Sequence, residues 1–204
     1  MKKLLYLPFL VLLFVTAAQS QATPPATPQQ PPKQEAQQAP QPPPTVTMIL
    51  DRSLKYPESE VVPAAEAMPE DKYSFAPTNG EFKGVRTFGQ QVRHVAAAQY
   101  MICAAILDEK PPVELGGENG PASIKTKDES VKFLKDSYAY CHKAYQSINE
   151  SNATGQVQSP FGANKVSRLG LAVLNVGHDF DHYGQMVEYL RMNGVIPPAS
   201  RGQQ

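Results

Sequence analysis

The sequence predicts an all-α fold, a four-helix bundle formed by residues 45–204 of the 204-residue chain. Four segments of this region place apolar residues at helical spacing, and no segment shows the convincing alternation of apolar and polar residues that indicates a strand. The region is also long enough for one domain and too short for two ordinary ones. We therefore expect a single folded domain behind an N-terminal region of different character.

The first 22 residues have the organisation of a secretory signal peptide. Two lysines follow Met1, the apolar run LLYLPFLVLLFV extends to Val15, and small and polar residues come next. The apolar run is shorter than the roughly 20 residues of an ordinary membrane span. We expect cleavage after Ser20 or Ala22 and an exported protein, periplasmic or extracellular, with no stable membrane span after cleavage. An uncleaved anchor is the alternative.

Residues 23–44 form a Pro/Gln-rich segment that contains 9 of the 20 prolines of the chain. The segment has no large apolar residue, so it cannot bury enough surface to offset the entropy lost on ordering. We predict a disordered linker.

The overall composition excludes two classes of protein. Lys+Arg and Asp+Glu number 19 each, so the basic excess with which nucleic-acid-binding proteins neutralise phosphates is missing. Two cysteines are too few for a disulfide-dense miniprotein or a Cys-rich zinc module. We expect no nucleic-acid partner.

The first two helices are predicted over about residues 47–68 and 87–107. Pro57 and Pro63 fall inside the first, which we therefore expect to be kinked or split. The second has apolar residues on two sides, which predicts burial on two sides. Its main stripe is Val92, Val95, Gln99, Ile102, Cys103 and Ile106, and the softer opposite stripe is His94, Ala98, Met101 and Ala105.

The last two helices are predicted over about residues 128–150 and 163–194. The third has the 3–4 spacing of a bundle seam, carried by Val131, Leu134, Tyr138, Cys141, Tyr145 and Ile148. The fourth ends at Gly194 and should be buried on two sides. One side is Leu169, Val173, Val176, Phe180, Tyr183, Val187 and Leu190, and the other is Leu171, Leu174, His178, His182, Met186 and Tyr189.

The connection between the second and third helices, roughly residues 108–127, is long and rich in Gly and Pro. A tight antiparallel hairpin needs only a few residues. This loop is long enough to carry the chain back along the bundle, so that the two helices run parallel. Its length alone leaves both arrangements open.

Three of the four histidines are candidate metal ligands. His178 and His182 are four residues apart on one helix, so their rings leave the same face. His94 on the second helix is the natural third ligand, and three imidazoles with an open position are typical of a catalytic zinc-like site. Satisfied or surface histidines are the alternative, because an isolated HxxxH pair is a weak signal. For His142 we predict a structural or edge position; a role as fourth ligand is the alternative.

The stretches AAEAMPEDKYSFAPTNGEFKGVRTFGQQVRHVA (64–96) and HDFDHYGQMVEYLRMNGVIPPAS (178–200) resemble the DinB-like superfamily, particularly its secreted bacterial members. The resemblance implies an up-down-down-up bundle with a long crossover between helices two and three. It also implies one divalent metal ion, nickel or zinc, held by His94, His178 and His182. Characterised members include thiol-dependent transferases and an isomerase, although an exported location argues against a cytosolic thiol as cosubstrate.

We therefore expect a metal-dependent enzyme with hydrolase or thiol-transferase chemistry and an unknown small-molecule substrate. A non-catalytic bundle that binds a metal or a small ligand is the alternative, and a homodimer is left open. Asp179 and Asp181 flank the ligands, but neighbouring helical positions point about 100° apart. We predict that both are solvated or act as helix caps. The catalytic groups stay unassigned.

The two cysteines form the candidate disulfide. Cys103 and Cys141 lie on the apolar seams of the second and third helices, at similar distances from the helix ends. Parallel helices would bring them to the same height, and an oxidising compartment permits the bond. Two buried free thiols are the alternative.

Overall fold

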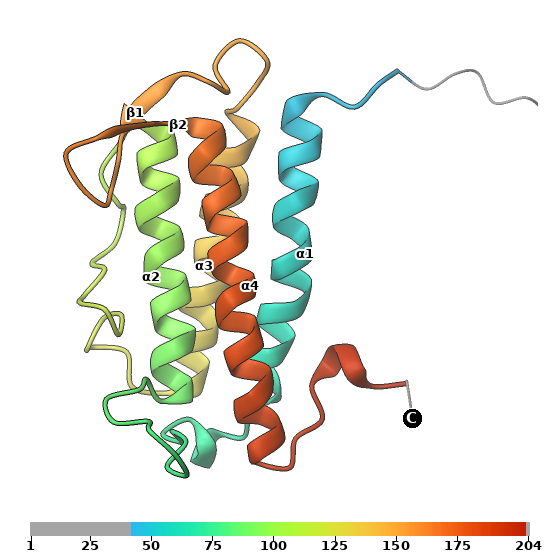
Figure 1. The fold of residues 1–204 in the computed structure, drawn as a ribbon, viewed down its shortest axis with the longest axis vertical. Coiled ribbons are helices and arrows are strands. Elements are labelled where there is room, and N and C mark those ends of the chain that lie inside the picture. The colour runs from blue at the N-terminus through green and yellow to red at the C-terminus, as the bar shows by residue number, and fades with distance from the viewer. Residues whose placement is uncertain (1–41, 203–204) are drawn as a thin grey trace, which may run out of the picture. The chain divides into compact units, whose positions relative to one another are not determined.

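The computed structural model describes residues 42–202, so the predicted signal peptide and nearly all of the predicted linker lie outside the described residues. Four helices form the bundle (Figure 1): α1 (Val46–Ala67), α2 (Phe88–Leu107), α3 (Lys127–Gln146) and α4 (Arg168–Met192). Two short 3-10 helices, η1 (Glu70–Lys72) and η2 (Pro198–Ser200), follow α1 and α4. The predicted all-α, four-helix fold is confirmed.

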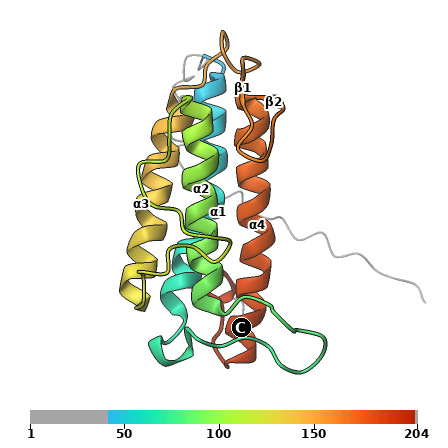
Figure 2. The same cartoon turned by 90° about the vertical axis from the view of Figure 1, so that its left-hand side faces the viewer.

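The helices have the up-down-down-up order. α1 and α4 run in one direction, α2 and α3 run in the other, and the segment between α2 and α3 descends the length of the bundle (Figures 1 and 2). Each helix contacts two neighbours: α2 packs on α3 and α4, and so does α1. The long loop is therefore a crossover, and the hairpin alternative is wrong.

A disulfide joins α2 to α3 within this parallel pair. Cys103 and Cys141 are bonded with their Cα atoms 5.3 Å apart, and both side chains are fully buried. Since each cysteine lies near the C-terminal end of its helix, the bond fits the parallel arrangement.

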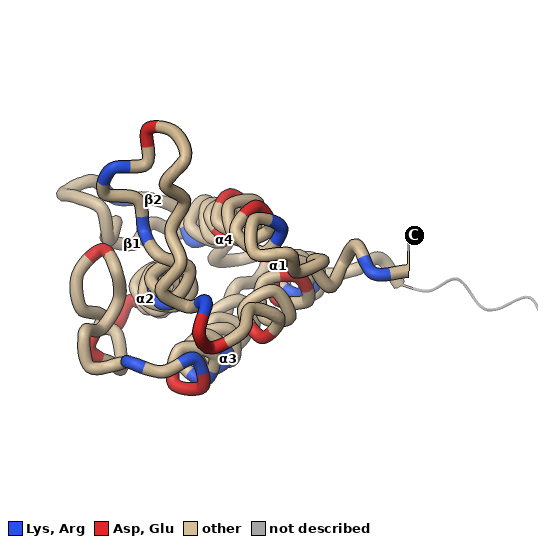
Figure 3. The backbone as a smooth tube through the Cα atoms, turned by 90° about the horizontal axis from the view of Figure 1, so that it is seen from below, with Lys and Arg blue, Asp and Glu red and all other residues tan. Residues whose placement is uncertain are grey.

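Acidic and basic residues are interspersed around the bundle viewed along its length (Figure 3). No helix among residues 42–202 combines the length and apolar character that crossing a membrane requires.

Local sequence sets the helix boundaries. α2 and α3 each begin with a capping box, in which Thr87 pairs with Gln90 and Thr126 with Glu129. α3 ends at Gln146, four residues before the predicted end. The reason is that Asn149 and its neighbours bond to nearby backbone groups, as when Asn152 Nδ2 donates to the Ser147 carbonyl, which competes with helix continuation.

Two other expectations about the elements need correction. α1 is one helix through Pro57 and Pro63, so the split form of the expected kinked or split helix is wrong. The start of the predicted fourth helix is instead part of a hairpin, β1 (Gln156–Gln158) paired antiparallel with β2 (Lys165–Ser167). Ser167 then caps α4 by accepting from Gly170 N.

α4 buries one face and not the two that were predicted. Val173, Leu174 and Phe180 are exposed, since α1 and α2 cover only one side of the helix. The buried face combines apolar and polar side chains: Leu171, Ala172, Asn175, Asp179, His182, Met186, Tyr189 and Leu190. The polar residues of this face include His182 and Asp179, which form part of the candidate site or lie beside it.

Candidate metal centre

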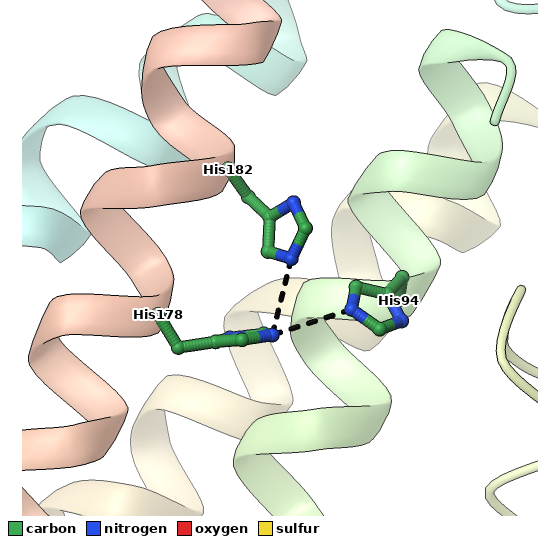
Figure 4. Close-up of side chains that lie close together, drawn as sticks. All are labelled: His94, His178 and His182. Carbon is green, nitrogen blue, oxygen red and sulfur yellow. Dashed lines mark hydrogen bonds between the residues drawn. The ribbon is translucent and has the colours of Figure 1, made fainter. Parts of the chain in front are cut away.

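His94 from α2 meets His178 and His182 from α4 in the space between the two helices (Figure 4). Nε2 of His178 lies 3.2 Å from Nε2 of His94 and 3.1 Å from Nε2 of His182. Among the described residues, these three form a group whose ligand atoms all lie within 4.8 Å of one another. The structure therefore brings together all three residues that were predicted from the sequence as candidate metal ligands.

Hydrogen bonding indicates which ring nitrogens carry protons. Nδ1 of His94 lies 2.6 Å from the carbonyl oxygen of Glu118, and because a carbonyl only accepts, this nitrogen is the donor. A neutral His94 therefore presents a bare lone pair at Nε2. Nδ1 of His178 lies 3.9 Å from Oδ1 of Asp179, beyond hydrogen-bonding distance. His94 thus directs its Nε2 lone pair at the ring nitrogens of His178 and His182.

This arrangement suits a bound cation. Lone pairs that converge on one point repel each other unless a positive charge lies between them. Nitrogen ligands of a tetrahedral ion with bonds of about 2.0–2.1 Å lie roughly 3.3 Å apart, close to the 3.1 and 3.2 Å separations here. The three residues therefore fit a divalent transition metal in donor type and spacing, and His94 fits it in tautomer as well.

The surroundings of His94 and His182 favour the neutral form of both rings. Burial lowers the pKa of His94, and the charge of Arg86 lowers it further. Burial also lowers the pKa of His182 to about 4, with smaller contributions from the neighbouring His178 and His94. Neutral imidazole is the metal-binding form, so no proton has to leave these two rings at neutral pH before they bind a metal.

Asp179 is the site residue that sequence reasoning placed wrongly. It was predicted to be solvated or to act as a cap, but its side chain is fully buried, since it points between α2 and α3. Its Oδ2 accepts from Gln99 Nε2 at 3.1 Å and from the Tyr138 hydroxyl at 3.2 Å. Ser137 in turn donates to Gln99 Oε1. This network holds the carboxylate beside the three-histidine group.

The other oxygen of Asp179 is available to His178. Oδ1 of Asp179 and Nδ1 of His178 are both buried and have no hydrogen-bond partner within residues 42–202. Burial raises the pKa of the Asp179 carboxyl, against the opposing effects of His178, Gln99 and Tyr138. Metal-bound histidines commonly donate their second ring N–H to a carboxylate, so Asp179 is placed to orient His178.

The crossover forms the outer wall of the site. A cavity of about 350 Å³ adjoins His94 and lies between α2 and the crossover; it is lined by His94, Ala97, Ala98, Met101, Leu115, Gly116, Gly117 and Glu118. The Glu118 carboxylate pairs with Arg86 at 2.8 Å. Gly120, with a φ of +74°, lies so close to α2 that an added Cβ would be 2.5 Å from Arg93 Cβ. Glycine here lets the crossover press against the helix.

The remaining candidates lie apart from the three-histidine group. His142 on α3 faces carboxylates of α1 with both ring nitrogens: Nδ1 is 2.7 Å from Asp51 Oδ1, and Nε2 is 2.9 Å from Glu58 Oε2. It therefore links α1 to α3, which is a structural position. Asp181 is exposed and accepts from Gln185 Nε2.

Comparison with known proteins agrees with the geometry. The family model of the DinB superfamily matches residues 54–186. The crystal structure of a DinB-like protein from Bacillus cereus ATCC 10987 superposes with a TM-score of 0.59 at 16% sequence identity, covering 76% of this chain and 96% of that chain. No curated protein matches the chain. Since the family match spans more than half of the sequence and includes all three histidines, the chain belongs to the DinB superfamily.

Proposed function

We propose that this protein binds one divalent metal ion, nickel or zinc, through Nε2 of His94, His178 and His182, and that it is a metal-dependent enzyme. The observation that carries the proposal is the convergence of three ring nitrogens within 4.8 Å. Three protein ligands leave a coordination position open, as in catalytic zinc sites. When bound, such an ion acts as a Lewis acid and lowers the pKa of a water or thiol, which supports hydrolysis or thiol transfer.

The residues of the chain would prepare the site in two ways. The Glu118 carbonyl fixes the orientation of His94 through its hydrogen bond, and the Asp179 carboxylate would accept from Nδ1 of His178 after a small movement. The cavity beside His94 is lined mainly by small or apolar side chains, including Ala97, Ala98 and Met101. It is suited to the apolar part of a small-molecule substrate and would keep bulk water from the reacting group.

The lining also supports the alternative, a bundle that holds a metal or a small ligand without turnover. Apart from His94, the only titratable side chain in the cavity wall is that of Glu118, which is largely exposed and already paired with Arg86. General acid-base catalysis would therefore depend on this one carboxylate. Its replacement by Gln should abolish turnover in an enzyme and leave metal content unchanged.

Metal analysis of the purified protein tests the proposal first. We expect one equivalent of nickel or zinc per chain, and His178→Ala should lose it in dilute solution because two ligands remain. His142→Ala is the matched control, since that histidine lies on α3 and contacts only α1 carboxylates. Full metal content in His178→Ala would refute the site.

Turnover of the metal-loaded protein on ester, amide and thiol-transfer substrates then separates the two functions. Bound metal without turnover of any of these substrates would favour the alternative, a bundle that holds a metal or a small ligand without catalysis.

Export is proposed separately, on the signal-peptide pattern of residues 1–22. An oxidising compartment outside the cytosol would also suit the bond between Cys103 and Cys141.

A further inference from the structure

Arg93 differs from the other arginines in its surroundings. Within residues 42–202, three arginines are partly buried: Arg86, Arg93 and Arg168. Arg86 donates to Glu118, and Arg168 donates to the carbonyl of Ile106. Arg93 makes no hydrogen bond or ion pair to any described residue, and its Nε is buried without a partner. A buried N–H without an acceptor is costly, so the Nε of Arg93 is suited to an acceptor from outside the chain.

The chain encloses Arg93 from two sides. Gly120 of the crossover covers its stem, as described above. At the other end, a Cβ added to Gly89 would lie 3.5 Å from Nη1 of Arg93, so the guanidinium lies against the first turn of α2.

The end of the Arg93 side chain faces a second cavity, of about 200 Å³, lined by Tyr73, Ser74, Thr87, Gly89, Gln90, Arg93 and Lys125. No lining residue carries a carboxylate, and every polar side chain among them can donate a hydrogen bond. The acidic residues closest in sequence to the lining already have partners. Asp71 pairs with Lys72, Glu70 accepts from Lys127 N, and Glu129 Oε2 accepts from the backbone amides of Lys125 and Thr126. The cavity therefore combines two cationic groups with neutral donors.

We propose that this cavity binds a small oxyanion, a phosphate or carboxylate group, held by the guanidinium of Arg93 and the ammonium of Lys125. Planar guanidinium groups bind both anions through paired N–H donors. Ser74, Thr87 and Gln90 complete the site with hydroxyl and amide donors. The proposal does not depend on the metal, because the lining residues differ from those of the cavity beside His94.

Anion titration monitored by NMR tests the proposal. Metal-free, full-length protein would be titrated with inorganic phosphate, sulfate and acetate at constant ionic strength, and the Nε–Hε resonance of Arg93 would be followed. We expect a saturable shift with at least one anion; the ranking of phosphate against acetate identifies the preferred class. Metal removal prevents the anions from binding at the histidines. No saturable shift with any of the three anions would overturn the proposal.

Variants separate this site from general attraction to positive charge. Arg93→Gln should weaken binding at least about tenfold, as expected for the loss of charge-assisted hydrogen bonds. Arg93→Lys, which keeps the charge but loses the planar fork, should be intermediate and guards against a folding defect. Arg52→Gln is the matched control, since Arg52 is exposed on α1. These variants would be followed through backbone amides of Thr87 and Gln90, and equal affinity in Arg93→Gln and wild type would refute the site.

Discussion

Reduction of the Cys103–Cys141 bond should lower the stability of the domain by a predictable amount. The two cysteines are 38 residues apart in sequence. In the chain-entropy model, closing a loop of this length restricts the unfolded chain by about 4 kcal/mol at 25 °C. For a domain of this size, each kcal/mol shifts the melting temperature by about 2–4 °C, so reduction should lower it by about 8–16 °C.

The assay compares oxidised and reduced wild-type protein by urea denaturation and calorimetry, so that no side chain changes. The double variant Cys103→Ala/Cys141→Ala should be at least as unstable as the reduced protein and should not respond to reductant. Both side chains are fully buried, so the variant also loses packing. Equal stability of oxidised and reduced wild type would contradict the reasoning. So would two free thiols per chain in denatured, unreduced protein.

Three further outcomes are expected. Asp179→Asn should weaken metal binding about 10- to 100-fold in chelator competition. Asp181→Asn is the control and should not weaken it, since Asp181 is next to His182 in sequence but is exposed. Equal metal affinities of the two variants would refute the orienting role of Asp179. Because the pKa of His182 is lowered to about 4 from about 6.5 in the unfolded chain, the metal-free protein should keep full stability above pH 6.5 and lose it as the pH falls toward 4. Urea denaturation at each pH measures this loss, and an unchanged slope in His182→Ala would contradict the assignment. Intact mass of protein from the cell envelope should place its first residue at Gln21 or Thr23, and a chain retaining Met1 in the cytosol would refute export.

The parts of the fold that could be predicted have strong local signals. Apolar spacing located all four helices, and Thr87 with Gln90 marks the start of α2 within one residue of the prediction. The pair His178 and His182 followed from the spacing of one turn. His94 was chosen as their partner from its place on the softer apolar stripe of α2. Spacing along the sequence could not show that this stripe faces α4, because tertiary packing decides which helix faces which.

The errors occurred where polar residues contribute to the core. Asp179 was predicted to be solvated or to act as a helix cap because neighbouring helical positions point about 100° apart. Its partners Gln99 and Tyr138 come from two other helices, which local spacing does not place. A signal did exist: Asn175, Asp179 and His182 recur at one helical face, four and three residues apart. The hairpin gave no comparable signal, since strands of three residues are too short for a period to show.

The disulfide also determines which parts of the molecule open together. The bonded cysteines lie outside both ends of the crossover, so the crossover belongs to a covalently closed ring that fastens the last turns of α2 and α3. If the hydrogen bond between His94 and the Glu118 carbonyl breaks, the crossover can move away from α2 while the disulfide keeps the two helix ends joined. Exchange of amide hydrogens in residues 108–126 should then proceed through local opening, while amides around Cys103 exchange only on global unfolding. A ligand could enter the cavity beside His94 without any loss of the core.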